Sequence, residues 1–232
     1  KVYISSPRAG AGYAGAVDVV DVGDPQAPVL LSSHAIAKQD VNAVTADGQW
    51  VALALSSDAF PFAQTAAVGT LAHTDGVISG SPARLIPMTS YVGTSVAVDG
   101  GRVLATSGDA GGAVVAVDPT DASVLASSAL EDPRSIGFEG STFAVHRGDR
   151  VEIIDGTTLA SLRQLPFVRG SDEDARSEVE LVGGKAFVTA GSHGVHVLDT
   201  SDGTLLDSIA VPNHVDLGLL ASESVANGLA VA

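Results

Sequence analysis

The sequence predicts an all-β protein built from repeated antiparallel modules, and three observations lead to this expectation. Apolar residues follow a period of two through most of the chain, which is typical of strands with one buried face. Asp-Gly and Gly-Gly pairs separate these runs, and such pairs tolerate the positive φ of a tight hairpin turn. A set of four strand-like segments then recurs in the same order along the chain.

The first two segments of each module form a predicted hairpin. The first is a short β-branched run that ends at an acidic or glycine turn, and the second is an apolar run directly after that turn. We expect the first segments at residues 42–48, 94–100, 134–140 and 177–184. The second segments follow at residues 50–55, 102–106, 141–145 and 185–189.

The last two segments form a second hairpin. The third segment alternates strictly and ends in aspartate, and a tight turn leads into the fourth. We expect third segments at residues 16–21, 113–118, 151–155 and 195–199, and fourth segments at residues 28–32, 123–127, 159–162 and 204–208. The most divergent copy has residues 68–72 as its third segment and residues 77–79 as its fourth.

The acid at the turn between the third and fourth segments marks the period of the repeat. It recurs at Asp21, Asp75, Asp118, Asp155 and Asp199, with gaps of 54, 43, 37 and 44 residues. Four-stranded propeller blades of about 40–50 residues have this spacing. We interpret these acids as structural, because a short carboxylate accepts backbone N–H bonds within its own turn.

A module of this size cannot bury its apolar faces alone, so the copies must stack against one another. The sequence therefore predicts a β-propeller of about five four-stranded antiparallel blades, formed by residues 1–232 as a single domain. Residues 1–6 read as a second segment and residues 225–232 as a first segment, so we expect the two ends to share one blade and close the ring. Part of a six- to eight-bladed propeller is the alternative.

Residues 17–30 and 195–202 resemble the LVIVD-type repeats and the related YVTN-type repeats of bacterial and archaeal cell-surface propellers. The resemblance extends over nearly the whole chain, and its motif is structural: a strand, an aspartate turn and a strand. It implies an exported propeller with an extracellular, cell-surface or periplasmic location. It implies no catalytic residues, because these families share none.

Composition excludes several classes of function. Asp and Glu number 27 against 12 Lys and Arg, so the net charge of −15 would repel a nucleic acid. The sequence has no cysteine, which excludes disulfides and zinc–thiolate sites. No apolar run has the length of a membrane span, so we expect no membrane insertion.

Loops at one end of the predicted blades vary in length, whereas the turns at the other end are uniformly tight. Because functional residues usually lie on variable loops held by a rigid scaffold, we place any ligand at the long-loop end, near the channel mouth. Hydration of the channel and capping of the loops is the alternative role for the residues there. The predicted ligand-binding residues are Asn42, Thr94, Arg134, Ser177 and Asn227 at the inner strands, with the aromatic residues Phe60, Phe62 and Tyr91 on the loops.

Three further groups of residues bear on metal binding and catalysis. Asp172, Glu173 and Asp174 form the candidate Ca²⁺ site, since calcium takes oxygen ligands, and a solvated charged loop is the alternative. His193 and His196 would point to opposite faces of a continuous strand, so we expect them to share no metal. The candidate acids of a hydrolase are Asp40, Asp132 and Glu178.

The sequence favours a non-enzymatic propeller that acts as a protein-interaction or cell-surface scaffold through its long-loop face. The alternatives are a glycosidase-like hydrolase or lyase with carboxylates at the channel mouth, and a propeller that binds carbohydrate or calcium. We expect a protein or glycan partner and no cofactor other than Ca²⁺.

Overall fold

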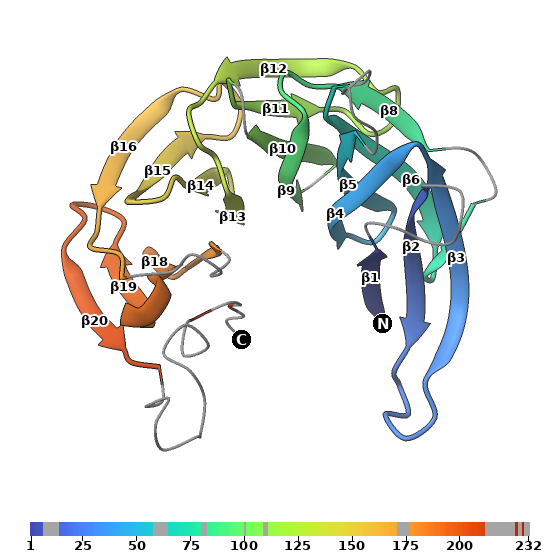
Figure 1. The fold of residues 1–232 in the computed structure, drawn as a ribbon, viewed down its shortest axis with the longest axis horizontal. Coiled ribbons are helices and arrows are strands. Elements are labelled where there is room, and N and C mark those ends of the chain that lie inside the picture. Colours follow the sequence, from blue (N-terminus) through green and yellow to red (C-terminus); the bar gives the residue numbers. More distant parts are fainter. Residues whose placement is uncertain are drawn as a thin grey trace. The chain divides into compact units, whose positions relative to one another are not determined.

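The computed structural model describes residues 1–6, 14–57, 65–79, 83–99, 101–108, 111–170, 177–211, 226 and 229. Within these ranges the chain forms 20 β-strands and one short 3-10 turn, with no α-helix (Figure 1). Contacts within the chain divide it into two compact units, Lys1–Asp132 and Pro133–Ala232. No helix in the described ranges is long and apolar enough to span a bilayer.

Unit 1 contains three antiparallel sheets. The first has the order β1 (Val2–Ser6), β2 (Ala14–Asp21) and β3 (Val29–Ala37). The second contains β4 (Gln39–Ala46), β5 (Trp50–Ser57) and β6 (Ala67–Thr74), and both β7 (Val77–Ile78) and β8 (Arg84–Pro87) pair with β6. The third has the order β9 (Val92–Asp99), β10 (Arg102–Gly108), β11 (Ala113–Val117) and β12 (Val124–Ala129).

Unit 2 contains two four-stranded antiparallel sheets. The fourth sheet has the order β13 (Ser135–Glu139), β14 (Thr142–His146), β15 (Arg150–Asp155) and β16 (Ser161–Pro166). The fifth has the order β17 (Val179–Val182), β18 (Lys185–Thr189), β19 (Val195–Asp199) and β20 (Leu205–Ile209). The 3-10 turn η1 (Gly191–His193) connects β18 to β19. The predicted order of four segments is thus confirmed in both sheets.

Small and β-branched side chains form the contacts between neighbouring sheets within each unit. Ala52, Ala54 and Val68 of the second sheet lie in one buried cluster with Val103 and Ala105 of the third. Such residues suit thin sheets that stack closely, because their short side chains fill the gap without long rotamers. This repeated stacking of antiparallel four-stranded sheets is the architecture of a multi-blade propeller, and it confirms the predicted fold class.

The second sheet departs from the predicted segments. Residues 77–79 were expected to form its fourth strand, but Val77–Ile78 only extends the tip of the hairpin, and β8 is the strand that pairs along β6. The reason is that β6 runs past the usual turn position before the chain reverses at Asp75 and Gly76, which have φ of 52° and 85°. Ala72 pairs with Trp50 at the register position where other copies have the turn aspartate, so the assignment of Asp75 to that position was wrong.

The predicted closing strand at residues 225–232 lies outside the described residues except for two positions. The backbone N–H of Ala226 donates to the carbonyl of Gly191, at an N–O distance of 3.2 Å. In the described part of the chain the first sheet has three strands. Closure by a shared blade, the total number of blades and the single-domain organisation therefore stay predictions.

Backbone contacts between neighbouring sheets leave no space for a side chain at two glycines of the inner strands. A Cβ atom at Gly93 of β9 would lie 2.6 Å from both the N and the O of Leu55 in β5. A Cβ atom at Gly137 of β13 would collide with the carbonyl of Val179 in β17. The inner strands can therefore pack closely only because these positions are glycine.

Hydrogen bonds at the outer strands also join neighbouring sheets. Ser32 of β3 donates through Oγ to the carbonyl of Gly76 at 3.0 Å, in the turn of the second sheet. The guanidinium of Arg84 in β8 donates to the Thr120 carbonyl, in the turn of the third sheet. In unit 2, Arg163 of β16 donates to the Thr200 carbonyl at 2.6 Å. Ser32, Arg84 and Arg163 occupy the same register position in their outer strands, so one contact recurs with different donors.

Gly93→Ala is expected to destabilise the protein strongly, because the new methyl group would overlap the backbone of Leu55. Overpacking of this kind costs about 1–3 kcal/mol, and a backbone obstacle places this site at the upper end. Gly48→Ala is the matched control, since a Cβ there meets nothing within 4 Å. Urea unfolding of both variants measures the difference. Equal unfolding midpoints would show that the second and third sheets do not pack as described.

Glu139→Gln tests the bond between the hairpin turns of unit 2. The Glu139 carboxylate accepts from the N–H groups of Gly183 and Gly184 at 2.7 and 3.2 Å, and these bonds lower the pKa of Glu139. A lowered folded-state pKa gives stability that is present above the ordinary glutamate pKa and is lost as the pH falls through the lowered value.

The melting temperature of Glu139→Gln should therefore lie below that of the wild type at neutral pH, and the two should converge in acid. Glu139→Asp is the matched control, because its shorter side chain keeps the charge but cannot reach both N–H groups. A difference between wild type and Glu139→Gln that does not change with pH would contradict this role.

Candidate functional site

Four predicted ligand residues occupy equivalent positions in or just before four inner strands. In unit 1 the pairing of β4 with β5 skips Asn42, and the pairing of β9 with β10 skips Thr94, so both residues are the extra residue of a β-bulge. In unit 2, Arg134 directly precedes β13, and Ser177 lies two residues before β17. The sequence alignment of these four residues is consistent with the strand registers.

The side chains of Asn42 and Thr94 are engaged in local hydrogen bonds. Asn42 donates through Nδ2 to Ser56 Oγ and, at 2.9 Å, to the carbonyl of Gly93 in the next sheet. Thr94 Oγ1 donates to Thr106 Oγ1 at 2.8 Å. These bonds stabilise the two bulges and join the second sheet to the third. The sequence did not predict this role in joining the sheets. Ligand binding by these residues, and the alternative of channel hydration and loop capping, both stay predictions.

Arg134 and Ser177 differ in their exposure. The Arg134 side chain is exposed, whereas Ser177 is buried. The Oγ atoms of Ser177 and of Ser135, the residue after Arg134, are buried and accept or donate no hydrogen bond among the described residues. Two buried hydroxyls thus lie at the start of neighbouring inner strands. The prediction included Ser177 but not Ser135, although Ser135 directly follows the predicted residue Arg134.

The recurring turn aspartates have the predicted structural role. Asp21, Asp118 and Asp199 each accept, through Oδ1, the backbone N–H two residues further on, at 2.8, 2.7 and 2.7 Å. Asp155 accepts from Thr157 and Thr158 at 3.0 and 2.7 Å. Hydrogen bonds from Ser201 lower the pKa of Asp199. These carboxylates are therefore part of the turns and not a catalytic array.

The candidate catalytic acids lie at different kinds of position. Asp40 is half-buried in β4, Asp132 is exposed at the end of unit 1 with a φ of 50°, and Glu178 is half-buried just before β17. The hydrolase alternative would require these three acids to converge, and that stays a prediction. Glu180 of β17 is a half-buried carboxyl group, and burial raises its pKa.

His193 and His196 lie closer together than expected. The prediction assumed one continuous strand, but His193 ends the 3-10 turn η1, and Gly194, with a φ of 82°, separates it from β19. The change of direction brings the two ring centroids to 6.2 Å. His193 is exposed and His196 is buried. The expectation that the two rings point to opposite faces was therefore wrong.

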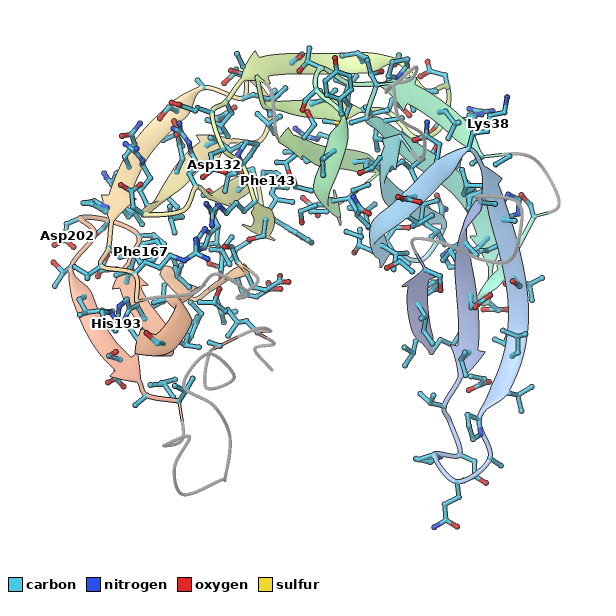
Figure 2. All side chains as sticks on the ribbon, viewed as in Figure 1. Lys38, Asp132, Phe143, Phe167, His193 and Asp202 are labelled. Carbon is cyan, nitrogen blue, oxygen red and sulfur yellow. The ribbon has the colours of Figure 1, made fainter. Side chains whose placement is uncertain are left out.

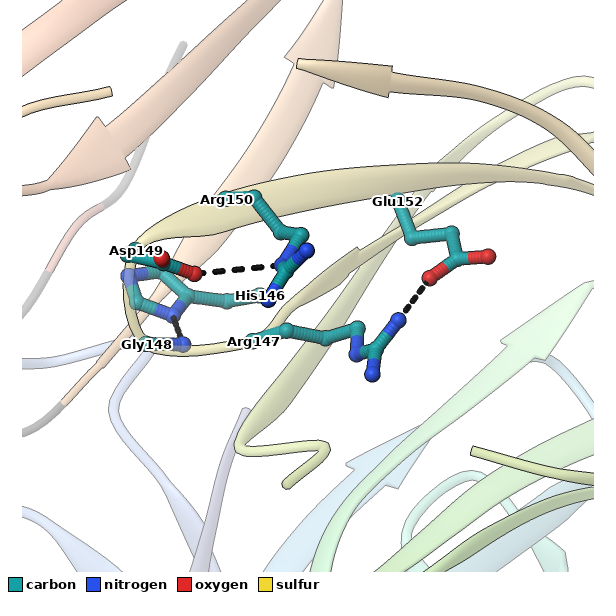
Figure 3. A network of polar contacts seen from close by, with 6 residues as sticks. All are labelled: His146, Arg147, Gly148, Asp149, Arg150 and Glu152. Atoms are coloured by element: carbon teal, nitrogen blue, oxygen red, sulfur yellow. Dashed lines mark hydrogen bonds and ion pairs between the residues drawn. The ribbon is translucent and has the colours of Figure 1, made fainter. Parts of the chain in front are cut away.

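A buried histidine connects the fourth and fifth sheets. His146 of β14 is fully buried, and its Nδ1 lies 3.1 Å from the N–H of Gly148 (Figure 3). Its Nε2 lies 3.1 Å from the carbonyl of Thr189 in β18. Because a backbone N–H can only donate a hydrogen bond, Nδ1 of His146 is the acceptor. The ring proton is therefore on Nε2, which donates a hydrogen bond to the Thr189 carbonyl. The surrounding turn also holds the Arg147–Glu152 and Asp149–Arg150 ion pairs.

Phe167 packs between two imidazoles in unit 2. Its ring contacts His146 edge-on at a centroid distance of 5.3 Å and His196 at 6.1 Å (Phe167 and His193 are labelled in Figure 2). The next residue, Val168, presents its carbonyl to His196 Nε2 at 2.9 Å and to His193 Nδ1 at 3.4 Å. The connection that follows β16 is thus held by His196 of β19 and by His193 of the turn η1.

The remaining predicted site residues lie mostly outside the described residues. These are Phe60, Phe62, Asn227 and the candidate calcium ligands Asp172, Glu173 and Asp174. Tyr91 is described and directly precedes β9. In the part of the chain that the structure describes, no three His, Asp or Glu side chains gather as a metal site.

Comparison with known proteins identifies the fold. No protein-family profile matches the chain, and no curated protein matches its sequence. Among solved structures, the crystal structure of BamB from Moraxella catarrhalis, a β-propeller, matches with a TM-score of 0.58 and 14% sequence identity. The match covers 90% of this chain and 64% of the BamB chain. Likeness at this level of identity supports the propeller fold alone.

Glu180→Gln is expected to stabilise the protein at neutral pH. Burial raises the folded-state pKa of Glu180, so the wild type loses stability as the pH rises from the ordinary glutamate pKa to the raised value. The amide carries no charge and avoids this loss. The gain should be modest, because the side chain is only half-buried, and it should disappear at low pH. Denaturant titrations at acidic and neutral pH give the comparison, and lower stability of Glu180→Gln at neutral pH would contradict it.

Proposed function

We propose that this chain is a non-enzymatic propeller that acts as a protein-interaction or cell-surface scaffold through its long-loop face. The main support is how the repeated polar residues are used. The turn aspartates bond to their own turns, and Asn42 and Thr94 bond within and between neighbouring sheets. The repeated turns and bulges therefore form a rigid frame, and the loops that vary between copies would determine which partner binds.

The charge of the chain limits the kind of partner. With a net charge of −15, the protein favours partners that are cationic or neutral on the contacting surface. The exposed Arg134 at an inner strand and Tyr91 before β9 are described residues of the proposed face. Arginine and tyrosine are side chains that frequently carry binding energy at protein interfaces. The resemblance to LVIVD-type and YVTN-type repeats supports an exported location.

Affinity capture from an envelope extract tests this function. The purified wild-type chain, Tyr91→Ala, Arg134→Ala and the outer-strand control Arg163→Ala serve as baits, with quantification by mass spectrometry. We expect the same proteins to be enriched by the wild type and by Arg163→Ala. Recovery should fall by roughly tenfold in at least one of the other variants, as expected for loss of an anchoring side chain.

Two results would contradict the scaffold function. The first is equal recovery by all four baits, which would show that the captured proteins do not use the long-loop face. The second is hydrolysis of a panel of aryl glycosides that Asp40→Asn or Glu178→Gln abolishes, because that outcome would identify an enzyme.

A further inference from the structure

Four outer strands carry a β-bulge at the same register position, and the extra residue of the bulge is leucine in each of them. The pairing of β2 with β3 skips one residue of β3, and β12, β16 and β20 each have one residue skipped in the same way. These bulge leucines are Leu31, Leu125, Leu162 and Leu206. A bulge redirects a side chain relative to its strand, so one residue type that recurs at this position indicates a shared role.

The bulge leucines lie at the surface. Leu125, Leu162 and Leu206 are 55, 59 and 48% exposed, whereas Leu31 is partly buried. In three of the strands the residue before the bulge is also apolar and more than half exposed, namely Leu30, Val124 and Leu205. Single apolar residues on a surface are ordinary, but an apolar site that recurs at one position of a repeat is typical of an interaction surface.

Packing against the next sheet does not cover these side chains. Arg163, the residue after Leu162, donates to the Thr200 carbonyl of the fifth sheet, so that sheet lies directly beside β16. Leu162 nevertheless remains exposed. Leu30 is 60% exposed although Ser32 of the same strand bonds to the turn of the second sheet. Natural edge strands are usually protected by charged residues or proline, so exposed leucine is not a device against edge pairing.

Carboxylates accompany the exposed apolar residues in three of the four hairpins. They stand three residues after the first turn aspartate, are exposed, and each accepts the backbone N–H two residues further on. These tip aspartates are Asp24, Asp121 and Asp202. Hydrogen bonds from Ser123 lower the pKa of Asp121, so this carboxylate stays charged in mildly acidic solution. The tip aspartates therefore place fixed negative charge beside the apolar side chains.

Basic residues are scarce in the same hairpins. Residues 118–129 and 199–209 contain no Lys, Arg or His. Arg84 and Arg163 of the preceding outer strands reach the turns of these two hairpins, where both donate to backbone carbonyls. Over the whole chain, acids outnumber bases by 27 to 12. The surface beside the bulge leucines thus combines apolar area with an acidic surround.

The chemistry of the occupant follows from this combination. A second copy of the chain does not fit, because tip aspartates would meet tip aspartates and each copy carries a net charge of −15. Lysine or arginine side chains complement the carboxylates, and large apolar side chains cover the leucines. A segment with both kinds of residue would meet both features of the surface.

We propose that the bulge leucines and the tip aspartates form an interaction surface for a protein segment that carries basic and large apolar side chains. The surface lies on outer strands and tight turns, so it is separate from the long-loop face of the scaffold function. Because the same residues recur on several sheets, one chain offers more than one such position, and linked segments would gain affinity from this multiplicity.

Fluorescence anisotropy with a labelled peptide of alternating Lys and Leu tests the surface, using the full chain at physiological salt. The wild type should bind this peptide more tightly than a peptide of alternating Lys and Ser. Replacement of Leu125, Leu162 and Leu206 by Ser should weaken binding at least about tenfold, as expected for loss of apolar anchors. The matched control replaces three exposed valines outside the outer strands by Ser and should bind like the wild type; these are Val2, Val168 and Val182.

A second pair of substitutions tests the charge. Asp121→Asn combined with Asp202→Asn keeps an acceptor oxygen for each turn and removes two carboxylates. This variant should bind the Lys–Leu peptide more weakly than the wild type and with less dependence on salt. Tyr91→Ala, on the long-loop side, should bind like the wild type, so failure of this surface is distinguishable from failure of the scaffold function.

Three results would overturn the proposal. The first is equal binding of the Lys–Leu and Lys–Ser peptides, which would reduce the interaction to net charge. The second is unchanged affinity in the leucine variant, or an equal loss in the valine control, once circular dichroism has verified that both are folded. The third is association with phosphatidylcholine vesicles that depends on the three leucines, because this would identify a lipid surface instead.

Discussion

The close stacking of thin sheets is the constraint on which the rest of this structure depends. The buried contacts between neighbouring sheets come largely from Ala, Val and Leu, and at Gly93 the backbone of one sheet contacts the backbone of the next. A core of this kind tolerates little change in volume, because small side chains leave no freedom for repacking. The recurring turn aspartates and the bulge residues Asn42 and Thr94 lie outside these apolar contacts.

Within each unit, hydrogen bonds at the strand ends also hold neighbouring sheets close together. In unit 1, Asn42 bonds across to Gly93, next to the position where the backbones meet. In unit 2, the fully buried His146 bonds across to Thr189 and requires a neutral ring to satisfy both of its partners. Hydrogen bonds to backbone groups fix the sheets relative to each other within a unit, while apolar packing alone would allow them to slide.

The features that the sequence predicted are those with local causes. Strand alternation and turn chemistry act within a few residues, so the strands and the bonds of Asp21, Asp118, Asp155 and Asp199 followed from the pattern. The true fourth strand of the second sheet was missed because the hairpin tip at residues 75–78 imitates a normal turn and strand. The proximity of His193 and His196 was missed because one glycine, Gly194, ends the turn before the strand begins. The bond of Glu139 to the next hairpin depends on a neighbouring sheet, and such a contact is not written in the local pattern.

The bonds from Ser32, Arg84 and Arg163 to the next turn have a consequence for how such repeats diverge. Each donor meets a backbone carbonyl, which every amino acid provides, so the acceptor residue is free to vary. The donor can also change between a short hydroxyl and a long guanidinium as the gap requires. Successive copies can thus drift apart in sequence while the joint between them persists. Correlated substitutions would not reveal such a joint, and the blade geometry can outlast detectable sequence similarity.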